Sequence, residues 1–579
     1  MTGTDVPLAR GFQPAKQGAQ RHYGSHPYFT KRAWNVVQEY VKHFSSPGDT
    51  VLDPFGGSGV TAVESLVLRR KAIYVDVNPW ACFLARLTAL APVNLGDLHA
   101  AFAEVEQRCA AAIEEIWRTP VKELARRAIR DWYPQNAPLP GNADVAYVEE
   151  LFTPRMLHGL AKLRATIMRT RDPVCRDLLL MAFSATLVRI NRTFLSAAGR
   201  AESRGGSAIF SIYRYKVAQE PVELPLWPQF AHRFRKLVQA KRETNQLIGD
   251  FYQENQTAVF RQASATALSE WLAPESVDYV YTDPPYGGHI AYLDLSTMWT
   301  AWLGMEVTAR DRDHEVVEGG SRNKSREDYE RLLSRSLVEI HRALKPGAWL
   351  SLVFAHRDIS YWGALVRACE GAGLAYCNTV VQPVGVVWSM HKKKNPLRVL
   401  SGELVLNFRK TGRPRRSLAS AGRSNALEIV LERCEAEIIR NTGASTEDLH
   451  HTVVPALLEH GSLEEFARMH GDLVPLLEQH FLYDADAGLW QLCEPRTCVG
   501  RHDQRALAKY YVSRYLDKLN GDSATLEQVL AYLSGIFALR AKFDTEMVRA
   551  ILNEVGTSGD EANWCASSRH AQGELAFQR

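Results

Sequence analysis

The chain has 579 residues, which is more than one ordinary hydrophobic core organises, so we expect two or three domains. No apolar run approaches the roughly 20 residues that a membrane-spanning helix needs, and the polar first 20 residues lack the apolar core of a signal peptide. The net charge of +4 is too small to indicate a nucleic-acid partner by itself, so any basic surface must be local. Nine cysteines without a framework spacing predict reduced thiols and a cytoplasmic protein.

The first informative pattern is a glycine-rich turn between a short strand and a helix. After a flexible arm over 1–20 and an amphipathic helix over 31–43, a strand over 50–53 runs into Asp53-Pro54-Phe55-Gly56-Gly57-Ser58-Gly59. A helical pattern follows over 60–68, and a second strand over 72–75 ends at Asp76. Glycines let a ligand approach the backbone, and a helix start offers free N–H groups. An acid at the end of the second strand suits ribose hydroxyls, so this pattern predicts a nucleotide-type cradle.

Residues 93–254 predict an inserted helical domain. The next core strand begins only at about Ala258, whereas a direct connection needs one helix and about 2–6 loop residues. The end of the insertion is basic and flexible, with aromatic residues among its arginines. Arginines on such a loop suit phosphate contact and base readout, and the alternative is a solvated basic loop. The candidate contacts in this stretch are Arg189, Arg192, Arg200, Arg204 and Arg214.

A second pattern ends the buried strand predicted over 277–281. The strand stops at Asp283-Pro284-Pro285-Tyr286, because proline lacks the N–H that a sheet ladder needs. Asp283 and the Pro284 carbonyl can each accept a hydrogen bond from an amino group, and the Tyr286 ring can stack on a planar base. An amine held by two acceptors turns its lone pair toward an electrophile. The alternative is a strand that merely ends in a Pro-Pro turn.

The remaining segments predict the far edge of the sheet and a C-terminal region. A helix over 293–303 should bury Trp299 and Trp302, and a helix over 328–344 should stop at 345–347. A strand over 349–354 and a hairpin of strands over 379–387 and 403–408 follow. At the hairpin tip, Lys392, Lys393 and Lys394 suit phosphates around a flipped nucleotide, or are only solvated.

Beyond the hairpin we expect a linker over 411–424, a helical domain over 425–555 and a disordered tail over 556–579. Cys493, Cys498 and His502 lie close together in the sequence, but no second ligand pair follows them. We therefore expect no structural zinc.

Together these motifs resemble the S-adenosylmethionine-dependent amino-methyltransferases of DNA, which modify adenine N6 or cytosine N4. The segment from Asp53 to Gly59 looks like their cofactor loop, and Asp283-Pro284-Pro285-Tyr286 looks like their catalytic tetrapeptide. Residues 26–31 are similar to the segment that packs on the methionine end of the cofactor. The resemblance covers roughly residues 20–90 and 255–410.

The resemblance implies an α/β fold, a Rossmann-like, doubly wound methyltransferase sheet with a helical insertion and a helical C-terminal domain. The catalytic domain would comprise residues 21–92 and 255–410. It implies S-adenosyl-L-methionine as the cofactor, with Ser264 standing where the family usually has an acid near the cofactor's adenine. The implied cofactor residues are Phe29, Thr30, Asp53, Pro54, Phe55, Gly56, Gly57, Gly59, Asp76 and Ser264.

The implied function is methyl transfer to the exocyclic amine of a flipped DNA base by Asp283, Pro284, Pro285 and Tyr286. In the family, Asp at the first tetrapeptide position goes more often with adenine, so adenine N6 is favoured over cytosine N4. The implied partners are DNA and subunits of a restriction or defence system. The alternatives are an N4-cytosine DNA methyltransferase, an RNA guanine N2-methyltransferase and a non-catalytic DNA-binding subunit that keeps the fold.

Overall fold

The computed structural model of the protein describes residues 6–15, 22–193, 208–218, 222–288, 290–383, 402–411, 425–493, 501–519, 521–537, 543–560 and 563–566. They divide into two compact units. The first contains the described residues up to 355 together with 364–383 and 402–411. The second contains residues 356–363 and the described residues from 425 onward.

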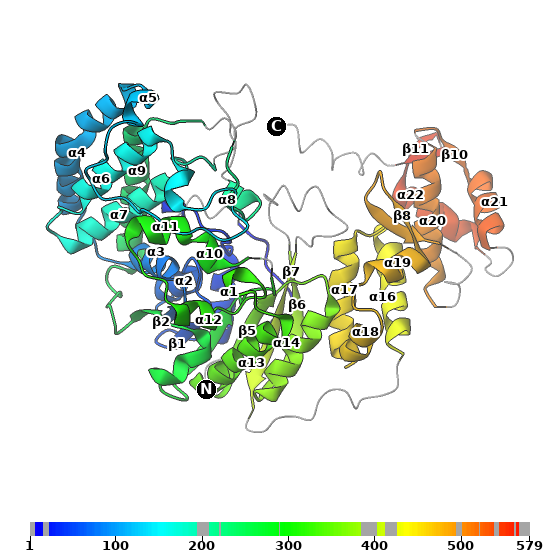
Figure 1. Ribbon diagram of the computed structural model, residues 1–579. Coiled ribbons are helices and arrows are strands. Elements are labelled where there is room, and N and C mark those ends of the chain that lie inside the picture. Colours follow the sequence, from blue (N-terminus) through cyan, green and yellow to red (C-terminus); the bar gives the residue numbers. More distant parts are fainter. Residues whose placement is uncertain are drawn as a thin grey trace. The chain divides into compact units, whose positions relative to one another are not determined.

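A seven-stranded sheet forms the centre of the first unit (Figure 1). Its strands lie in the order β3-β2-β1-β4-β5-β7-β6, and β1 to β5 are parallel. The chain steps outward from β1 to β3 and then returns to β4 on the other side of β1, so a topological switch point lies between β1 and β4. The strands are β1 Thr50–Asp53, β2 Lys71–Asp76, β3 Ala258–Gln262, β4 Val277–Thr282, β5 Leu344–Phe354, β6 Leu374–Gln382 and β7 Glu403–Lys410.

The predicted closing hairpin is confirmed as an antiparallel pair. β7 pairs antiparallel with both β5 and β6, and it lies between them. The strand predicted to begin at 349 starts at Leu344 instead. Its pairing register with β4 shifts between Leu344 and Trp349. Lys345-Pro346-Gly347, predicted to follow the end of the preceding helix, therefore form an irregular stretch inside β5. Gly347 has φ +77, which is the kind of backbone such an irregularity uses.

The helices around the sheet follow the sequence pattern closely. The residues of α13 show why: Ser325 and Asp328 form a reciprocal capping box at its start, and a basic last turn precedes β5. The helix predicted over 293–303 is divided in two, and Trp299 and Trp302 are fully buried as expected. These helices are α1 Trp34–Phe44, α2 Val60–Val67, α3 Pro79–Ala89, α10 Tyr292–Leu295, α11 Thr297–Leu303, α12 Ala309–His314, α13 Arg326–Ala343 and α14 Ile359–Gly371.

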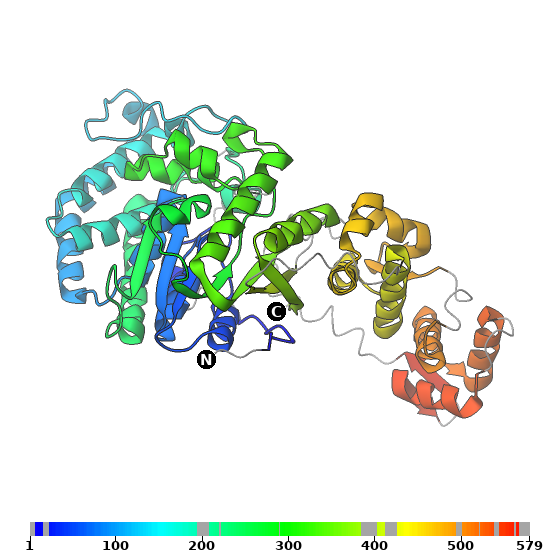
Figure 2. The same cartoon turned by 90° about the horizontal axis from the view of Figure 1, so that it is seen from below.

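Among the described residues, six α-helices of the insertion lie between α3 and β3. Of these, α4, α5, α6, α7 and α9 pack together in Figure 1, and Figure 2 shows the same region from below. The helix predicted over 98–130 ends at Arg118, because Thr119-Pro120 cannot continue it. α6 and α7 each begin at a proline whose preceding residue, Thr153 or Asp172, caps the first turn. The helices are α4 Leu95–Arg118, α5 Val121–Leu124, α6 Pro154–Ile167, α7 Pro173–Leu187, α8 Ala208–Ser211 and α9 Leu226–Ile248.

All of these helices except α5 contribute to one hydrophobic core that also contains residues of α3 and α11. The rings of Trp80 in α3 and Trp299 in α11 stack with their centroids 4.5 Å apart. Ser184 of α7 joins both: its hydroxyl accepts from the Trp80 indole at 3.1 Å, and its carbonyl accepts from the Trp299 indole at 3.1 Å. The insertion is therefore continuous with the sheet's own packing.

Residues 6–15, expected within a flexible arm, lie along the edge strand β6. Asn378 donates to the Leu8 carbonyl at 2.6 Å, and Gln382 hydrogen-bonds both backbone groups of Phe12. The Phe12 ring meets Tyr40 edge-on at 6.0 Å. Apolar contacts at Leu8 and Phe12 hold this segment, which its polar composition hid.

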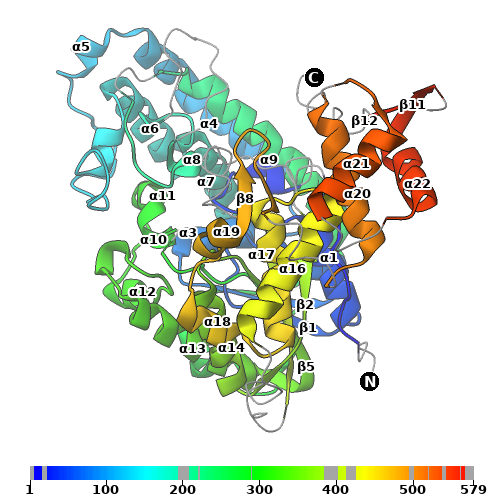
Figure 3. The ribbon, with the colours of Figure 1, turned by 90° about the vertical axis from the view of Figure 1, so that its right-hand side faces the viewer.

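The second unit is mostly helical, as predicted (Figure 3). Its helices are α16 Ala426–Asn441, α17 Thr446–Glu459, α18 Leu463–Met469, α19 Val474–His480, α20 Gln504–Lys518, α21 Leu526–Phe537 and α22 Thr545–Val555. Short strands were not predicted: β8 Phe481–Asp484 pairs with β9 Leu489–Leu492, and β10 Ala524–Thr525, β12 Asn563–Ala566 and β11 Gly556–Asp560 form a small sheet. Two of these strands lie in the predicted disordered tail. The linker residues 412–424 lie outside the described residues.

Three further expectations concern spans, thiols and metals. Within the described ranges, no helix is both long and apolar enough to cross a membrane. The cysteines that the structure describes are all free thiols. His502 pairs with Glu435 at 2.8 Å and Cys493 is exposed, while Cys498 lies outside the described residues. Across the described part of the chain, no cluster of three histidine, cysteine or acidic side chains is arranged to hold a metal.

Candidate active site

A pocket opens at the carboxyl ends of β1, β2 and β4, next to the switch point. The loop after β1, the end of β2 and the end of β4 contribute to its lining, together with residues from 28–32, 264–265, 292 and 314–316. Most of the predicted site residues line it, namely Thr30, Asp53, Pro54, Phe55, Gly56, Gly57, Asp76, Ser264, Asp283 and Pro285. The prediction of one common site is therefore consistent with the geometry.

The loop after β1 requires glycine at two positions. A Cβ on Gly56 would lie 2.2 Å from the Tyr74 ring, so no side chain fits between this loop and β2. Gly59 has φ +80, and a Cβ there would lie 2.7 Å from the Ala85 Cβ of α3. The loop backbone is thus drawn close to the sheet, which leaves the space above it for a ligand. Gly59 itself serves helix packing and is not in the pocket lining.

The carboxylate of Asp76 organises this loop. Its Oδ2 accepts the Gly57 N–H at 2.8 Å, and its Oδ1 accepts the Asn78 N–H at 2.8 Å. Burial raises the pKa of Asp76 to about 6, and these backbone donors oppose the rise. The side chain is in the pocket lining at the end of β2, where the ribose acid was predicted.

Asp53 joins the ends of β1 and β4. Its Oδ1 accepts from the Thr282 hydroxyl at 2.8 Å and from the Phe55 N–H at 3.2 Å. The residue is only 5% exposed, and burial raises the pKa of its carboxyl to about 7 despite these donors. Asp53 therefore ties the cofactor-type loop to the strand that carries the tetrapeptide.

The tetrapeptide begins directly after β4. The Tyr286 hydroxyl donates to Oδ1 of Asp283 at 2.5 Å, and the Pro285 carbonyl accepts from the Tyr329 hydroxyl at 2.8 Å. The Tyr286 ring packs edge-on against Phe354 of β5 with centroids 5.1 Å apart. Pro284 is buried, so it and Tyr286 adjoin the pocket without being part of its lining.

Arg32 was not predicted as a site residue, yet it is the centre of the tetrapeptide's charge network. Its Nε donates to Oδ2 of Asp283 at 2.6 Å, and its Nη2 donates to the Tyr286 hydroxyl at 2.7 Å. Its Nη1 pairs with Glu403 at the start of β7. Burial raises the pKa of Asp283, and Glu403 adds to this rise while Arg32 opposes it. A single arginine carries no sequence pattern, although Arg32 directly follows the segment 26–31.

That segment brings Tyr28 rather than Phe29 to the pocket. Tyr28 lines the pocket, whereas the Phe29 ring lies in the aromatic core, 5.7 Å from Trp80 and 5.9 Å from Trp299. Thr30 lines the pocket as predicted, and its hydroxyl hydrogen-bonds the Tyr292 hydroxyl at 3.1 Å. The prediction placed Phe29 at the cofactor, whereas the side chain that this segment contributes to the pocket lining is Tyr28.

Ser264 lies in the pocket wall after β3. Its hydroxyl donates to the His314 carbonyl at 3.2 Å and lies 2.9 Å from the Thr266 hydroxyl. This contact brings the segment 314–316 into the same wall, so His314, Glu315 and Val316 also line the pocket. Sequence reasoning missed these three residues because nothing in their local pattern marks them.

The predicted DNA contacts have different surroundings. Arg189 is exposed, whereas Arg192 donates to the Glu150 carbonyl at 2.9 Å. Arg214 forms an ion pair with Asp144 at 2.5 Å and donates to the Asn142 carbonyl, so its charge is engaged within the chain. Arg200, Arg204, Lys392, Lys393 and Lys394 lie outside the described residues.

Comparison with known proteins finds that one part of the chain is similar to a known family. The sequence model of the N6/N4 methyltransferases, described as DNA methylase, matches residues 10–86. The Type II methyltransferase M.MjaII of Methanocaldococcus jannaschii is 31% identical over 83 residues. The matched part is 14% of this chain and 16% of that protein, about a sixth of its length. These matches support the resemblance inferred from the motifs for the segment that contains the glycine loop.

Solved structures are matched more distantly. TTHA0409 of Thermus thermophilus, described as a DNA modification methylase, is 16% identical, with 29% of this chain and 60% of that chain covered and a TM-score of 0.16. The rRNA methyltransferase aviRa of Streptomyces viridochromogenes is 12% identical, with 71% and 93% covered and a TM-score of 0.23. At these scores the fold rests on the strand order described above.

Proposed function

We propose, from the relation of residues 10–86 to the N6/N4 DNA methylases, that this chain transfers a methyl group from S-adenosylmethionine to an exocyclic amine of a DNA base. The observation that supports this most directly is that Asp283 shares one pocket with the glycine loop and Asp76. An adenosyl cofactor suits this pocket for three reasons. The loop backbone is close-packed, a carboxylate lies at the end of β2, and the pocket wall offers side chains on which a planar ring can stack. When bound, that cofactor supplies an electrophilic methyl group.

The protein's own residues would hold the amine for direct attack. Oδ2 of Asp283 faces two nitrogens of Arg32, whereas among the described residues Oδ1 accepts only the Tyr286 hydroxyl and keeps a lone pair for an amine hydrogen. The ion pair with Arg32 favours the carboxylate, which is the stronger acceptor. With its hydrogens held by Asp283, the amine nitrogen would turn its lone pair toward the methyl group that the cofactor would supply. Positioning of the two reactants carries the rate enhancement.

We propose adenine N6 as the target atom. Both adenine and cytosine amines are conjugated into their rings, so both need a strong acceptor to localise the lone pair. Asp283 is such an acceptor, and the family pattern associates Asp here with adenine. Restriction or defence subunits remain predicted partners, and the free thiols fit the predicted cytoplasmic location.

DNA contact is proposed at a basic cluster formed by Arg189, His232, Arg233, Arg235 and Lys236. Burial, followed by the charge of Arg189, lowers the pKa of Arg233 to about 10. The same charges help burial to lower the pKa of His232. Arg235 and Lys236 are exposed on α9 beside them. Phosphates would relieve this mutual repulsion.

Nucleoside mass spectrometry on DNA and RNA treated with the purified protein tests the proposal. We expect N6-methyladenine in DNA with wild-type protein and none with Asp283→Ala, which should keep nearly unchanged cofactor affinity. N4-methylcytosine would correct the target base only. Methylated guanine in RNA would support the RNA alternative, and no product on any substrate would support the non-catalytic alternative.

A further inference from the structure

We infer that Glu315 is the acceptor for the exocyclic amine of the cofactor's adenine, in place of the acid that the family usually carries after β3. This inference rests on the proposed function and names one residue of its cofactor site. Glu315 lies 51 residues beyond Ser264 and comes from the segment after α12, yet both residues line the same wall of the pocket. A carboxylate there supplies the acceptor that the sequence around Ser264 lacks.

The surroundings of Ser264 explain why a second residue is needed. Its hydroxyl caps the turn after β3, accepting the Thr266 N–H at 3.1 Å, and it donates to the His314 carbonyl at 3.2 Å. The Ser264 hydroxyl thus both accepts and donates a hydrogen bond within the protein. Its contact with residue 314 closes the pocket wall. The residue that this contact places next in the wall is Glu315.

The Glu315 side chain has the properties of a ligand acceptor. It is 7% exposed, and its Oε1 accepts the Leu293 N–H at 2.9 Å. Among the described residues, no donor to its Oε2 is found. Burial raises the pKa of Glu315 to about 7 against the effect of the Leu293 N–H, so the carboxyl lacks the donors that would offset its desolvation. An amine from the ligand would provide one.

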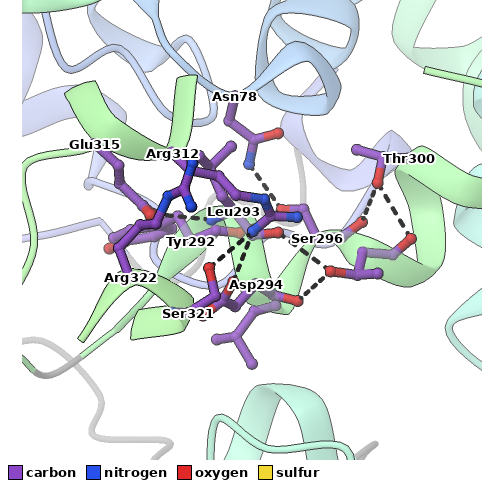
Figure 4. Close-up of polar contacts among 12 residues, drawn as sticks. Asn78, Tyr292, Leu293, Asp294, Ser296, Thr300, Arg312, Glu315, Ser321 and Arg322 are labelled. Carbon is purple, nitrogen blue, oxygen red and sulfur yellow. Dashed lines mark hydrogen bonds and ion pairs between the residues drawn. The ribbon is translucent and has the colours of Figure 1, made fainter. Parts of the chain in front are cut away.

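Polar contacts hold residues 312–321 in place, and Figure 4 shows those around Asp294. Arg312 pairs with Asp294 at 2.9 Å, and the Ser321 N–H donates to the other oxygen of Asp294 at 2.8 Å. Lys324 donates to the carbonyls of Arg312 and Glu315. With residues 312, 315 and 321 fixed by α10 and Lys324, the carboxylate is held in place before a ligand arrives.

Adenine also fits this end of the pocket. Ala265, Val77 and Val316 line it beside Glu315, which provides apolar surface for a planar ring. Asp76, the predicted ribose acid, ends the strand adjacent to β3. In the ligand, the exocyclic amine lies at the far side of the adenine from the ribose. With the ribose at the end of β2, the amine would therefore lie at the wall after β3. A hydrogen-bonding acceptor at that position discriminates strongly, because a ligand without the amine leaves it unpaired.

Calorimetry with two product analogues tests the inference without any methyl transfer. The probes are S-adenosylhomocysteine and S-inosylhomocysteine, in which a carbonyl replaces the adenine amine. We expect wild-type protein to prefer the adenosyl compound by at least about tenfold. Glu315→Gln keeps the acceptor for Leu293 and can turn its amide N–H toward the carbonyl, so the preference should fall to near parity. Binding of both compounds by this variant would also show that it is folded.

Glu104→Gln, which alters an exposed pair with Arg108 on α4, is the matched control, and it should leave the adenosyl preference unchanged. An unchanged preference in Glu315→Gln, or loss of binding of both compounds, would overturn the assignment of Glu315. Loss of the preference in Ser264→Ala alone would return the role to Ser264. If wild-type protein bound neither compound, the proposed function itself would fail, which is distinct from these outcomes.

Discussion

Arg32 donates its Nε–H to Oδ2 of Asp283 at 2.6 Å, across 251 residues of sequence. The same guanidinium also pairs with Glu403, so one cation faces two carboxylates next to the pocket. Of the three side chains, Asp283 is the one that the proposed reaction needs as a carboxylate. Its protonation is therefore set by the two neighbours, which act in opposite directions.

The first prediction follows from these opposite directions. Arg32→Ala removes the cation and should raise the pKa of Asp283 further, which lowers the rate at neutral pH and moves the acidic limb of the profile to higher pH. Glu403→Gln should move that limb to lower pH, because Glu403 adds to the raised pKa. Single-turnover methyl transfer measured against pH separates the two. Arg69→Ala, which breaks an exposed pair with Asp250, is the control, and parallel shifts in both site variants would contradict the network.

The second prediction concerns cofactor affinity. Asp76→Asn should weaken S-adenosylmethionine binding by about 1–3 kcal/mol, because it removes a charged acceptor from the end of β2 and loosens the loop at Gly57. Isothermal titration calorimetry measures the change. Asp278→Asn is a matched control, since Asp278 also accepts a backbone N–H, that of Thr50, but at the opposite end of the strands. Equal affinities for wild type and Asp76→Asn would remove Asp76 from the site.

The third prediction concerns stability without ligand. The pKa of Asp53 is raised from 3.8 to about 7, so its contribution to folding is present at low pH and is lost as pH rises through this range. Asp53→Asn does not titrate and should gain on wild type with rising pH, by up to about 4 kcal/mol. Denaturant unfolding at acidic and neutral pH tests this. Exposed Asp250→Asn should show no such trend, and a constant difference for Asp53→Asn would contradict the prediction.

The fourth prediction concerns the basic cluster. Replacing Arg189 and Arg235 by alanine should weaken DNA binding and lower the slope of log affinity against log salt by about two, one for each phosphate that is no longer neutralised. Arg214→Ala is the matched control, because that arginine is already paired with Asp144. Fluorescence anisotropy over a salt series measures the slopes. If the slope changed only in Arg214→Ala, the DNA contact would lie at Arg214 and not at the basic cluster.

The sequence predicted the central strands and the pocket because their signals are local. Glycines at Gly56 and Gly59, the acid at Asp76 and two prolines after Asp283 each mark a strand end, and strand ends of a parallel sheet meet at one edge. Arg32 and Glu315 could not be found in this way. Each acts through a partner more than twenty residues away, Asp283 or Leu293, and such a pairing leaves no trace in the residues beside it.

Two features at the edges of the fold, residues 6–15 and the strand pair β8–β9, were also not predicted. Residues 6–15 look like a loose arm, because their polar composition hides the two apolar anchors, Leu8 and Phe12. The short strands β8 and β9 have only four residues each, too few for alternation to stand out against helical neighbours. In both cases the deciding contacts are tertiary.

The shared core at Ser184 means that the insertion is not an interchangeable cassette. Its hydroxyl and carbonyl accept from the indoles of Trp80 and Trp299, which belong to the sheet's own helices. Grafting residues 93–254 onto another scaffold would carry the acceptor Ser184 without the two indoles that donate to it, and removing them would leave both indoles without that acceptor. If the insertion contacts DNA as proposed, a change of target sequence is expected to come from substitution of exposed side chains such as Arg189. The buried core that the insertion shares with the sheet's helices would stay unchanged.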